Sequence, residues 1–279
     1  MEPRPKAYYI LSAFFALFLL FLYGPTITIA ILSFQGPGGG LTFPMQGTSL
    51  HWFRDLFEQQ AVGDIWGSFR RSFALGLMVM VTTVVLSVMG GLAFRKKFKG
   101  SGILFYLIIT SLVIPSILIS LGVGLIFSQS GFNVHWATSG FGSQLTWTLP
   151  FGLLIMFAVF NRFDKSYEEA ARDLGATSWQ TLRHVVLPII GPSLIGVALF
   201  GFTLSYDEFA RTLLTAGSYN TLPLEIFGMT TNVTTPVLYA LGTLTTVFSL
   251  IMIGLFLCLA LWSTRRKARA GSDAGKGML

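Results

Sequence analysis

Long apolar runs alternate with polar segments along this chain, and the alternation predicts helices that cross a membrane. Each run is close to the roughly 20 residues that a helix needs to cross the hydrocarbon core of a bilayer. The runs cover residues 8–34, 73–94, 102–127, 145–160, 189–206 and 237–262. We therefore predict an all-α membrane protein with six transmembrane helices, which form one domain over residues 8–262.

The polar segments between the runs predict the loops and the ends. Residues 35–72 form one long loop, in which Trp52, Phe53, Leu56 and Phe57 share a helical face; this spacing predicts an interfacial helix lying flat on the bilayer. Other segments are a short N-terminus over 1–7, a second long loop over 207–236 and a basic tail over 263–279, which we expect to be disordered.

The polar segment 161–188 carries signals for two short helices. Ser166 and Glu169 have the spacing of a capping box, and Thr177 and Gln180 repeat it. Gly175, between the boxes, most easily takes the left-handed conformation that ends a helix. Pro188 disfavours helical geometry in the residue before it, so we expect the second helix to end there. The segment therefore predicts a helix, a glycine elbow and a helix.

Composition and charge support a membrane protein and indicate its orientation. Apolar residues make up 53% of the chain and charged residues only 11%, which is far from the soluble average. With six spans, 15 of the 19 Lys and Arg residues lie on the side shared by the termini and segment 161–188. The positive-inside rule places that side in the cytoplasm. Topology and anionic lipids then explain the net charge of +7, so no nucleic-acid partner is expected.

Few residues suit catalysis or ligand chemistry. Cys258 is the single cysteine, and the three histidines lie on different segments, so we expect no metal site. Residues 271–277 resemble a phosphate loop only in part, because three residues instead of four separate the glycines and no Ser or Thr follows Lys276. We expect no cofactor in this chain. The Glu168-Glu169 pair lacks the membrane histidines of an intramembrane protease, so we expect no enzyme.

Segment 161–188 resembles a known signature. Glu169-Ala170-Ala171, three residues, Gly175, nine residues, Val185, one residue and Leu187-Pro188 follow the Glu-Ala-Ala motif of permease subunits of binding-protein-dependent ABC importers, with Val185 where the motif has Ile. The resemblance implies the type I importer permease fold and a coupling segment that docks on an ATPase. The alternative for these residues is an ordinary amphipathic loop helix.

The same resemblance implies partners and a location. A dimer of cytoplasmic ATPase subunits would use ATP and Mg²⁺, a second, related permease subunit would complete the path, and an extracytoplasmic solute-binding protein would deliver the cargo. The chain would be a multi-pass protein of the bacterial plasma (inner) membrane, in contact with its lipids and with both termini cytoplasmic. A secondary transporter is the more distant alternative, for which we find no paired broken helices or internal repeats.

Three stretches resemble spermidine/putrescine-type permeases in particular: Ser49–Phe57, Ser205–Phe209 and Thr221–Ile226. A polyamine is therefore the expected cargo, although an opine, an amino-acid derivative, a sugar or an oxyanion remains an alternative. Tyr206, Asp207 and Glu208 are candidates for the substrate path, because acidic groups would attract cationic amines. Structural roles remain the alternative, since Ser205 and Glu208 also have the spacing of a capping box.

Overall fold

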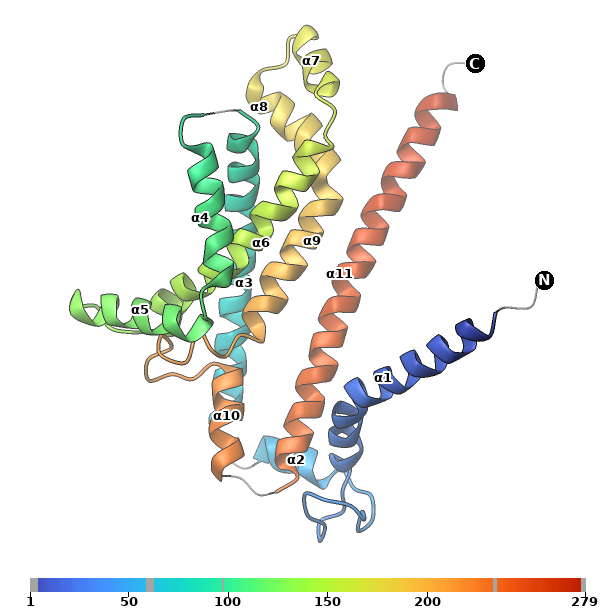
Figure 1. The fold of residues 1–279 in the computed structure, drawn as a ribbon, viewed down its shortest axis with the longest axis vertical. Coiled ribbons are helices and arrows are strands. Elements are labelled where there is room, and N and C mark those ends of the chain that lie inside the picture. Colours follow the sequence, from blue (N-terminus) through green and yellow to red (C-terminus); the bar gives the residue numbers. More distant parts are fainter. Residues whose placement is uncertain (1–4, 59–62, 97, 233–234, 277–279) are drawn as a thin grey trace. The chain divides into compact units, whose positions relative to one another are not determined.

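The computed structural model describes residues 5–58, 63–96, 98–232 and 235–276, nearly all of the regular structure being helical. The chain divides into two compact units, of which one comprises residues up to 64 with 226–250 and the other comprises 65–225 with 251 onward. Figure 1 labels the helices of both units.

The first unit contains α1 (Lys6–Leu32) and α2 (His51–Glu58). Trp52 and Leu56 of α2 are buried, whereas Phe57 is exposed, so only part of the predicted apolar face is covered by protein. The loop between the helices is ordered by the Gln35 side chain, whose Oε1 accepts the Gln46 N–H at 2.7 Å. This long loop is therefore ordered by its own contacts. It contains a short helix at the position that the sequence predicts.

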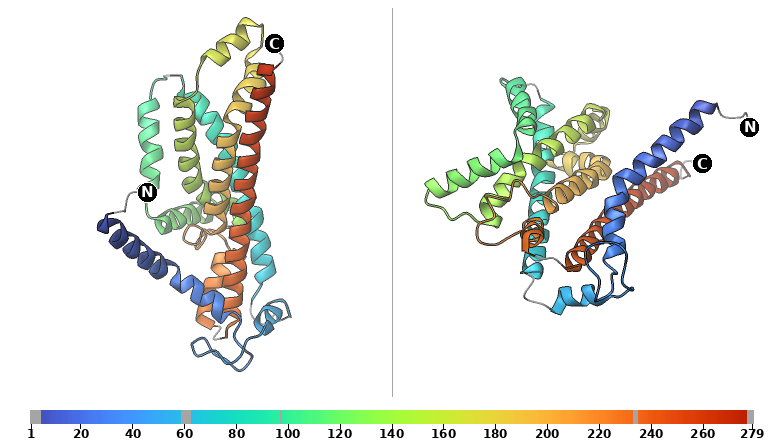
Figure 2. Two further views of the ribbon diagram at one scale, coloured as in Figure 1. Left: turned by 90° about the vertical axis from the view of Figure 1, so that its right-hand side faces the viewer. Right: turned by 60° about the horizontal axis from the view of Figure 1, so that its bottom comes forward.

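The second unit is built on three helices that lie side by side (Figures 1 and 2): α3 (Ile65–Phe94), α6 (Phe141–Asn161) and α9 (Leu187–Tyr206). Lipid is as apolar as Leu, so close packing and buried hydrogen bonds hold such helices together. Thr83 and Thr148 provide one such bond between α3 and α6, with 2.8 Å between their hydroxyl oxygens. Gly91 of α3 lets the Phe160 ring approach the backbone, since a Cβ there would lie 2.7 Å from ring atoms.

The predicted third span is bent. Residues 101–129 form α4 (Ser101–Val113) and α5 (Ser116–Gln129), which meet at 107°. Ile114 and Pro115 both have extended ψ angles, as expected at a proline that cannot donate a backbone hydrogen bond and restricts the residue before it. The segment predicted as the third span is therefore not one continuous helix, and the pair is either a broken span or a re-entrant loop.

Several other boundaries differ from the prediction. The second span begins at Ile65, eight residues earlier than expected, and the fourth is continuous from Trp136 through a π-turn, η2 (Trp136–Gly140), into α6. Within the second predicted long loop lies α10 (Leu222–Asn232). The described residues thus contain five helices long and apolar enough to cross a membrane, or six if the bent pair counts as one span.

The last helix, α11 (Val237–Lys276), contains the predicted sixth span and continues beyond it. The expected disorder of the tail is therefore wrong as far as Lys276. Over 265–270 the chain consists of Arg, Lys and Ala, strong helix formers that extend the preceding helix. Residues 277–279, which we also expected to be disordered, lie outside the described residues.

Candidate functional site

The predicted glycine elbow is present at one end of the second unit, between α7 (Ser166–Asp173) and α8 (Ser178–Thr181). Gly175 has a φ of +84°, the left-handed conformation that favours glycine. The Ala176 N–H donates to the Ala171 carbonyl at 3.0 Å, and the Gly175 N–H donates to the Arg172 carbonyl at 2.8 Å. These two bonds form a Schellman motif, which ends α7 firmly and turns the chain into α8.

The N-terminus of α7 is capped differently from the prediction. The first helical residue is Ser166 itself, and its N–H donates to the Asp164 Oδ1 at 2.9 Å, so the predicted Ser166–Glu169 capping box is wrong. The Glu169 N–H, which the Ser166 hydroxyl would accept in a capping box, instead donates to the Lys165 carbonyl at 3.1 Å. The hydrogen bonds from Ser166 hold the pKa of Asp164 below its ordinary value.

The second predicted capping box is confirmed: the Gln180 N–H donates to Thr177 Oγ1 at 3.3 Å, and the Thr177 N–H donates to Gln180 Oε1 at 2.8 Å. The helix does not end at Pro188, however. A π-turn, η3 (Leu182–Val186), leads directly into α9, which contains Pro188 in its first turn. The wider turn accommodates the missing proline N–H, so α8 is continuous with a membrane span.

The residues of the predicted signature differ in their exposure to solvent. Glu169 and Ala170 are exposed, Ala171 and Leu187 are half-buried, and Pro188 is exposed at the start of α9. Beside them lie three exposed apolar side chains, Tyr167, Leu174 and Trp179, with exposures of 55%, 90% and 65%. Sequence reasoning missed these three, because their spacing follows no helical stripe across the elbow.

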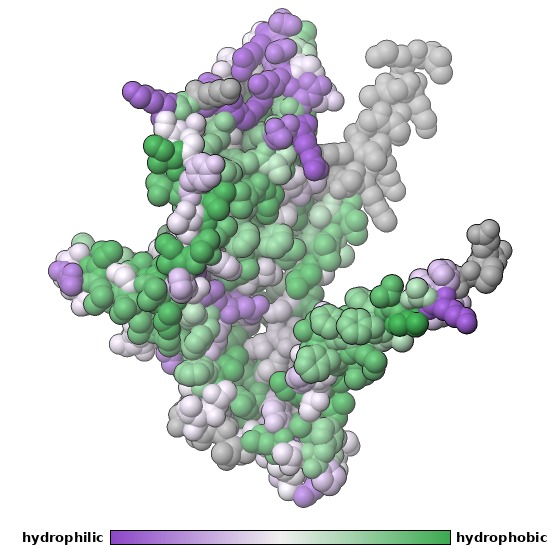
Figure 3. Space-filling model, viewed as in Figure 1, coloured by the Kyte–Doolittle hydropathy of each residue, from purple (hydrophilic) through white to green (hydrophobic). Residues whose placement is uncertain are grey.

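This elbow lies in a polar setting. Figure 3 shows hydrophilic surface gathered over α7 and α8, and hydrophobic surface over α4 and α5 on the same face. Large apolar side chains exposed within a polar surface commonly mark a docking site for another protein. The elbow therefore combines a fixed shape, small residues that permit close approach, and uncovered apolar contacts.

The candidate path residues lie at the opposite end of α9 (Figure 1). Tyr206 is buried and its ring stacks on Phe202 at 5.7 Å between centroids. Asp207 is exposed at the end of the helix, and neighbouring atoms that partly desolvate its carboxylate raise its pKa. Glu208 Oε1 accepts the Arg211 N–H at 3.0 Å, and Ser205 donates to Gln144 Oε1, so the predicted Ser205–Glu208 capping box is wrong.

Arg211, which lies in the second predicted long loop, is fully buried next to Glu208. Its guanidinium donates to Thr146 Oγ1 at 2.5 Å and lies 5.0 Å from the centre of the Trp147 ring. Its carbonyl accepts hydroxyl groups from Ser120, Ser143 and Thr215. The loop after α9 is thereby fastened to α5 and α6. A glutamate three residues before an arginine was the only local signal for this arrangement.

Apolar spans and an exposed elbow between two of them are the features of a multi-span membrane protein. Comparison with known proteins identifies the family. A profile described as "Binding-protein-dependent transport system inner membrane component" matches residues 84–265, and the chain belongs to that family. It is accordingly a transport subunit of the membrane.

Several curated proteins are similar to the chain along most of its length. The spermidine/putrescine transport system permease protein PotC of Haemophilus influenzae is 30% identical over 256 residues, which cover 88% of this chain and 94% of that protein. Its Escherichia coli K12 counterpart is 26% identical over 84% of this chain and 87% of its own length. The putrescine transport system permease protein PotI of the same strain is 27% identical over 80% of this chain and 81% of its own length.

Solved structures share the fold at low sequence identity. A bacterial ABC transporter that imports the acidic polysaccharide alginate has a chain with a TM-score of 0.66 and 16% identity, with 96% of this chain and 99% of that chain covered. The MetNI methionine ABC transporter gives a TM-score of 0.56 and 16% identity, over 77% of this chain and 99% of that one. These similarities establish the ABC importer permease fold for the chain.

Proposed function

We propose that this chain forms half of the translocation path of an ATP-driven polyamine importer, with putrescine or spermidine as the cargo. The observation that carries the cargo class is the similarity to spermidine/putrescine permeases along 88% of the chain. The exposed carboxylate of Asp207, at the end of α9, has the charge that would attract a cationic amine. A second, related permease subunit completes the path, and an extracytoplasmic solute-binding protein delivers the cargo.

We also propose that the elbow of α7 and α8 docks into a groove on a cytoplasmic ATPase subunit, where ATP and Mg²⁺ are used. The Schellman motif at Gly175 supports this role because it fixes the angle between the two short helices. Tyr167, Leu174 and Trp179 offer apolar contacts, and Ala170 permits close approach. Closure of two ATPase subunits would move the elbow, and the continuous helix from Ser178 to Tyr206 would carry that movement across the membrane.

The proposed orientation places both termini and the elbow in the cytoplasm of a bacterial cell, with the chain in the inner membrane. The distribution of Lys and Arg supports this orientation. The two long loops, predicted over 35–72 and 207–236, would then face outward, where the binding protein approaches. Anionic lipids of the inner leaflet would contact the basic residues at the cytoplasmic ends of the spans.

The test is uptake of labelled putrescine and spermidine by cells that carry the whole transport system, with wild type compared with Gly175→Asp. An L side chain at a φ of +84° strains the elbow, and its charge would enter the docking surface. We expect ATP-dependent uptake of a polyamine that Gly175→Asp abolishes. If the protein assembles with an ATPase but takes up no polyamine, only the proposed cargo is wrong. If the wild type assembles with no ATPase, the proposed docking role is wrong.

A further inference from the structure

An ion pair joins α7 to the end of α3. Arg95 Nη1 lies 2.5 Å from Glu168 Oε1, and Arg95 Nη2 lies 3.2 Å from Glu168 Oε2, so the two groups meet in a bidentate arrangement. Their side chains are only 14% and 15% exposed. A bidentate, largely buried pair has a defined geometry and is shielded from water, unlike most pairs between exposed side chains.

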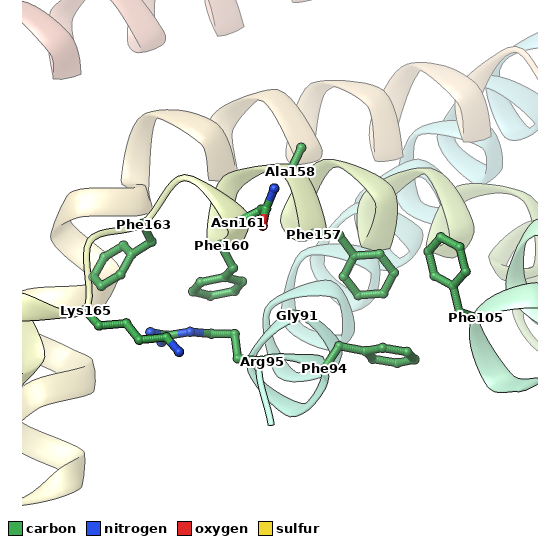
Figure 4. Close-up of a pocket in the computed structure, with 10 residues that line it drawn as sticks. All are labelled: Gly91, Phe94, Arg95, Phe105, Phe157, Ala158, Phe160, Asn161, Phe163 and Lys165. Atoms are coloured by element: carbon green, nitrogen blue, oxygen red, sulfur yellow. The ribbon is translucent and has the colours of Figure 1, made fainter. Parts of the chain in front are cut away.

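Two phenylalanine rings hold the arginine in place. The guanidinium carbon of Arg95 lies 5.2 Å from the centre of the Phe160 ring and 5.1 Å from that of Phe163, within the range of a cation–π interaction. Figure 4 shows the Arg95 side chain running beneath both rings. Phe160 itself is buried against Gly91 of α3. The position of the guanidinium is therefore determined by the packing of α3 on α6.

The pair adds a third attachment for α7. Residues 162–165 connect α7 to α6, and the glycine elbow connects it through α8 and η3 to α9. Two connections through short pieces of backbone would still permit α7 to rotate slightly about the line that joins them. In the part of the chain that the structure describes, no other ion pair joins α7 to a membrane span. The attachment to α3 opposes that pivot, because it lies on a different helix from the other two.

We propose that Arg95 is a positioning residue for energy coupling, which ties the docking elbow to α3 through Glu168. This inference rests on the proposed docking of α7 and α8 on an ATPase. Displacement of α7 then moves α3 together with α6 and α9, with which α3 is closely packed. Without the pair, α7 yields to the ATPase and part of the nucleotide cycle proceeds without moving the spans.

The test uses the complete importer, with both permease subunits, the ATPases and the binding protein, in proteoliposomes. The measured quantity is polyamine taken up per ATP hydrolysed, for Arg95→Glu, Glu168→Arg and the double variant. We expect each single variant to lower this ratio about tenfold, equivalent to about 1.4 kcal/mol, and the double variant to restore most of it. Arg95→Gln gives a milder second variant, and Arg95→Lys should retain part of the ratio, because a lysine cannot make the bidentate contact.

Lys96→Glu is the matched control, because it makes the same charge change at the next residue, whose side chain is exposed. It should leave uptake per ATP unchanged. An unchanged ratio in Arg95→Glu and Arg95→Gln would overturn the proposal, as would a lower melting temperature with no change in the ratio or a double variant as poor as the single ones. If the wild type fails to assemble with its ATPase, the proposed docking role fails instead.

Discussion

Single residues at the two ends of α9 carry the features on which transport would depend. On the side of its first residue, in the elbow before α8, Gly175 has a backbone conformation that other residues adopt only with strain. At the other end, Asp207 holds an exposed carboxylate, and Arg211 four residues later is fully buried. Burial lowers the pKa of Arg211, and the neighbouring Glu208 carboxylate opposes this effect. The Arg211 cation is therefore buried, whereas the Asp207 carboxylate is accessible to solvent.

Asp207→Asn should weaken polyamine uptake. Removing one partner of an exposed charge interaction, worth up to about 1 kcal/mol, should raise the half-saturating cargo concentration about two- to fivefold. Because the pKa of Asp207 is raised, its carboxylate is protonated at a higher pH than an ordinary aspartate. Wild-type uptake should therefore fall as the external pH is lowered through that pKa, and the contribution of Asp207 should be absent from Asp207→Asn.

Glu225→Gln is the control for this experiment, because Glu225 is another acidic residue of the same segment and binds the Asn220 amide at 2.9 Å. It should retain the wild-type response to pH. Equal uptake by Asp207→Asn and wild type at every cargo concentration and pH would remove Asp207 from the path.

At the scale of elements, the contact between α3 and α6 determines how the coupling elbow is supported. Gly91 and Phe160 bring the two helices together, and the same Phe160 ring contacts the Arg95 guanidinium. The buried cluster of Met156, Phe160, Val186, Ile190 and Val197 continues this contact to α9 and the π-turn before it. The packing of these spans therefore also determines the position of the elbow.

Gly91→Ala should destabilise the second unit. The new Cβ would lie 2.7 Å from atoms of the Phe160 ring and 3.0 Å from the Met156 Cβ, so the helices must separate or the ring must move. Overpacking of this kind costs about 1–3 kcal/mol. Thermal unfolding of the purified protein in detergent measures it. Gly142→Ala in α6, where the structure places nothing within 4 Å, should unfold as the wild type does, and equal melting temperatures for the two variants would contradict the argument.

At the scale of the whole molecule, the question is which ends of the spans face the cytoplasm. The proposed topology follows from charge, with α7 and α8 on the cytoplasmic side and the loop after α9 on the outer side. Ser166 and Ser218 lie in these two regions and both are exposed. Each can therefore report its side of the membrane once it is replaced by cysteine.

The labelling experiment replaces Cys258, the single cysteine, by serine and then introduces Ser166→Cys or Ser218→Cys separately. A membrane-impermeant maleimide added to spheroplasts should label the Ser218→Cys protein. It should label the Ser166→Cys protein only after the membrane is permeabilised. The reverse pattern would invert the orientation and contradict the positive-inside assignment.

Local patterns in the sequence determined the helical class, the approximate positions of most spans and the elbow at Gly175. These features depend on runs of apolar residues, on capping residues and on the conformational freedom of glycine, all of which act within a few residues of the chain. The second capping box, at Thr177 and Gln180, was predictable for the same reason.

The tertiary structure alone decided the features that depend on residues far apart in sequence. The continuation of the helix through Pro188 requires a π-turn packed against neighbouring spans, and the 107° bend before α5 determines which helices that segment contacts. The burial of Arg211 depends on acceptors on other helices. The Arg95–Glu168 pair spans 73 positions of sequence. Such contacts depend on how helices pack in three dimensions, which the local pattern of one chain does not specify.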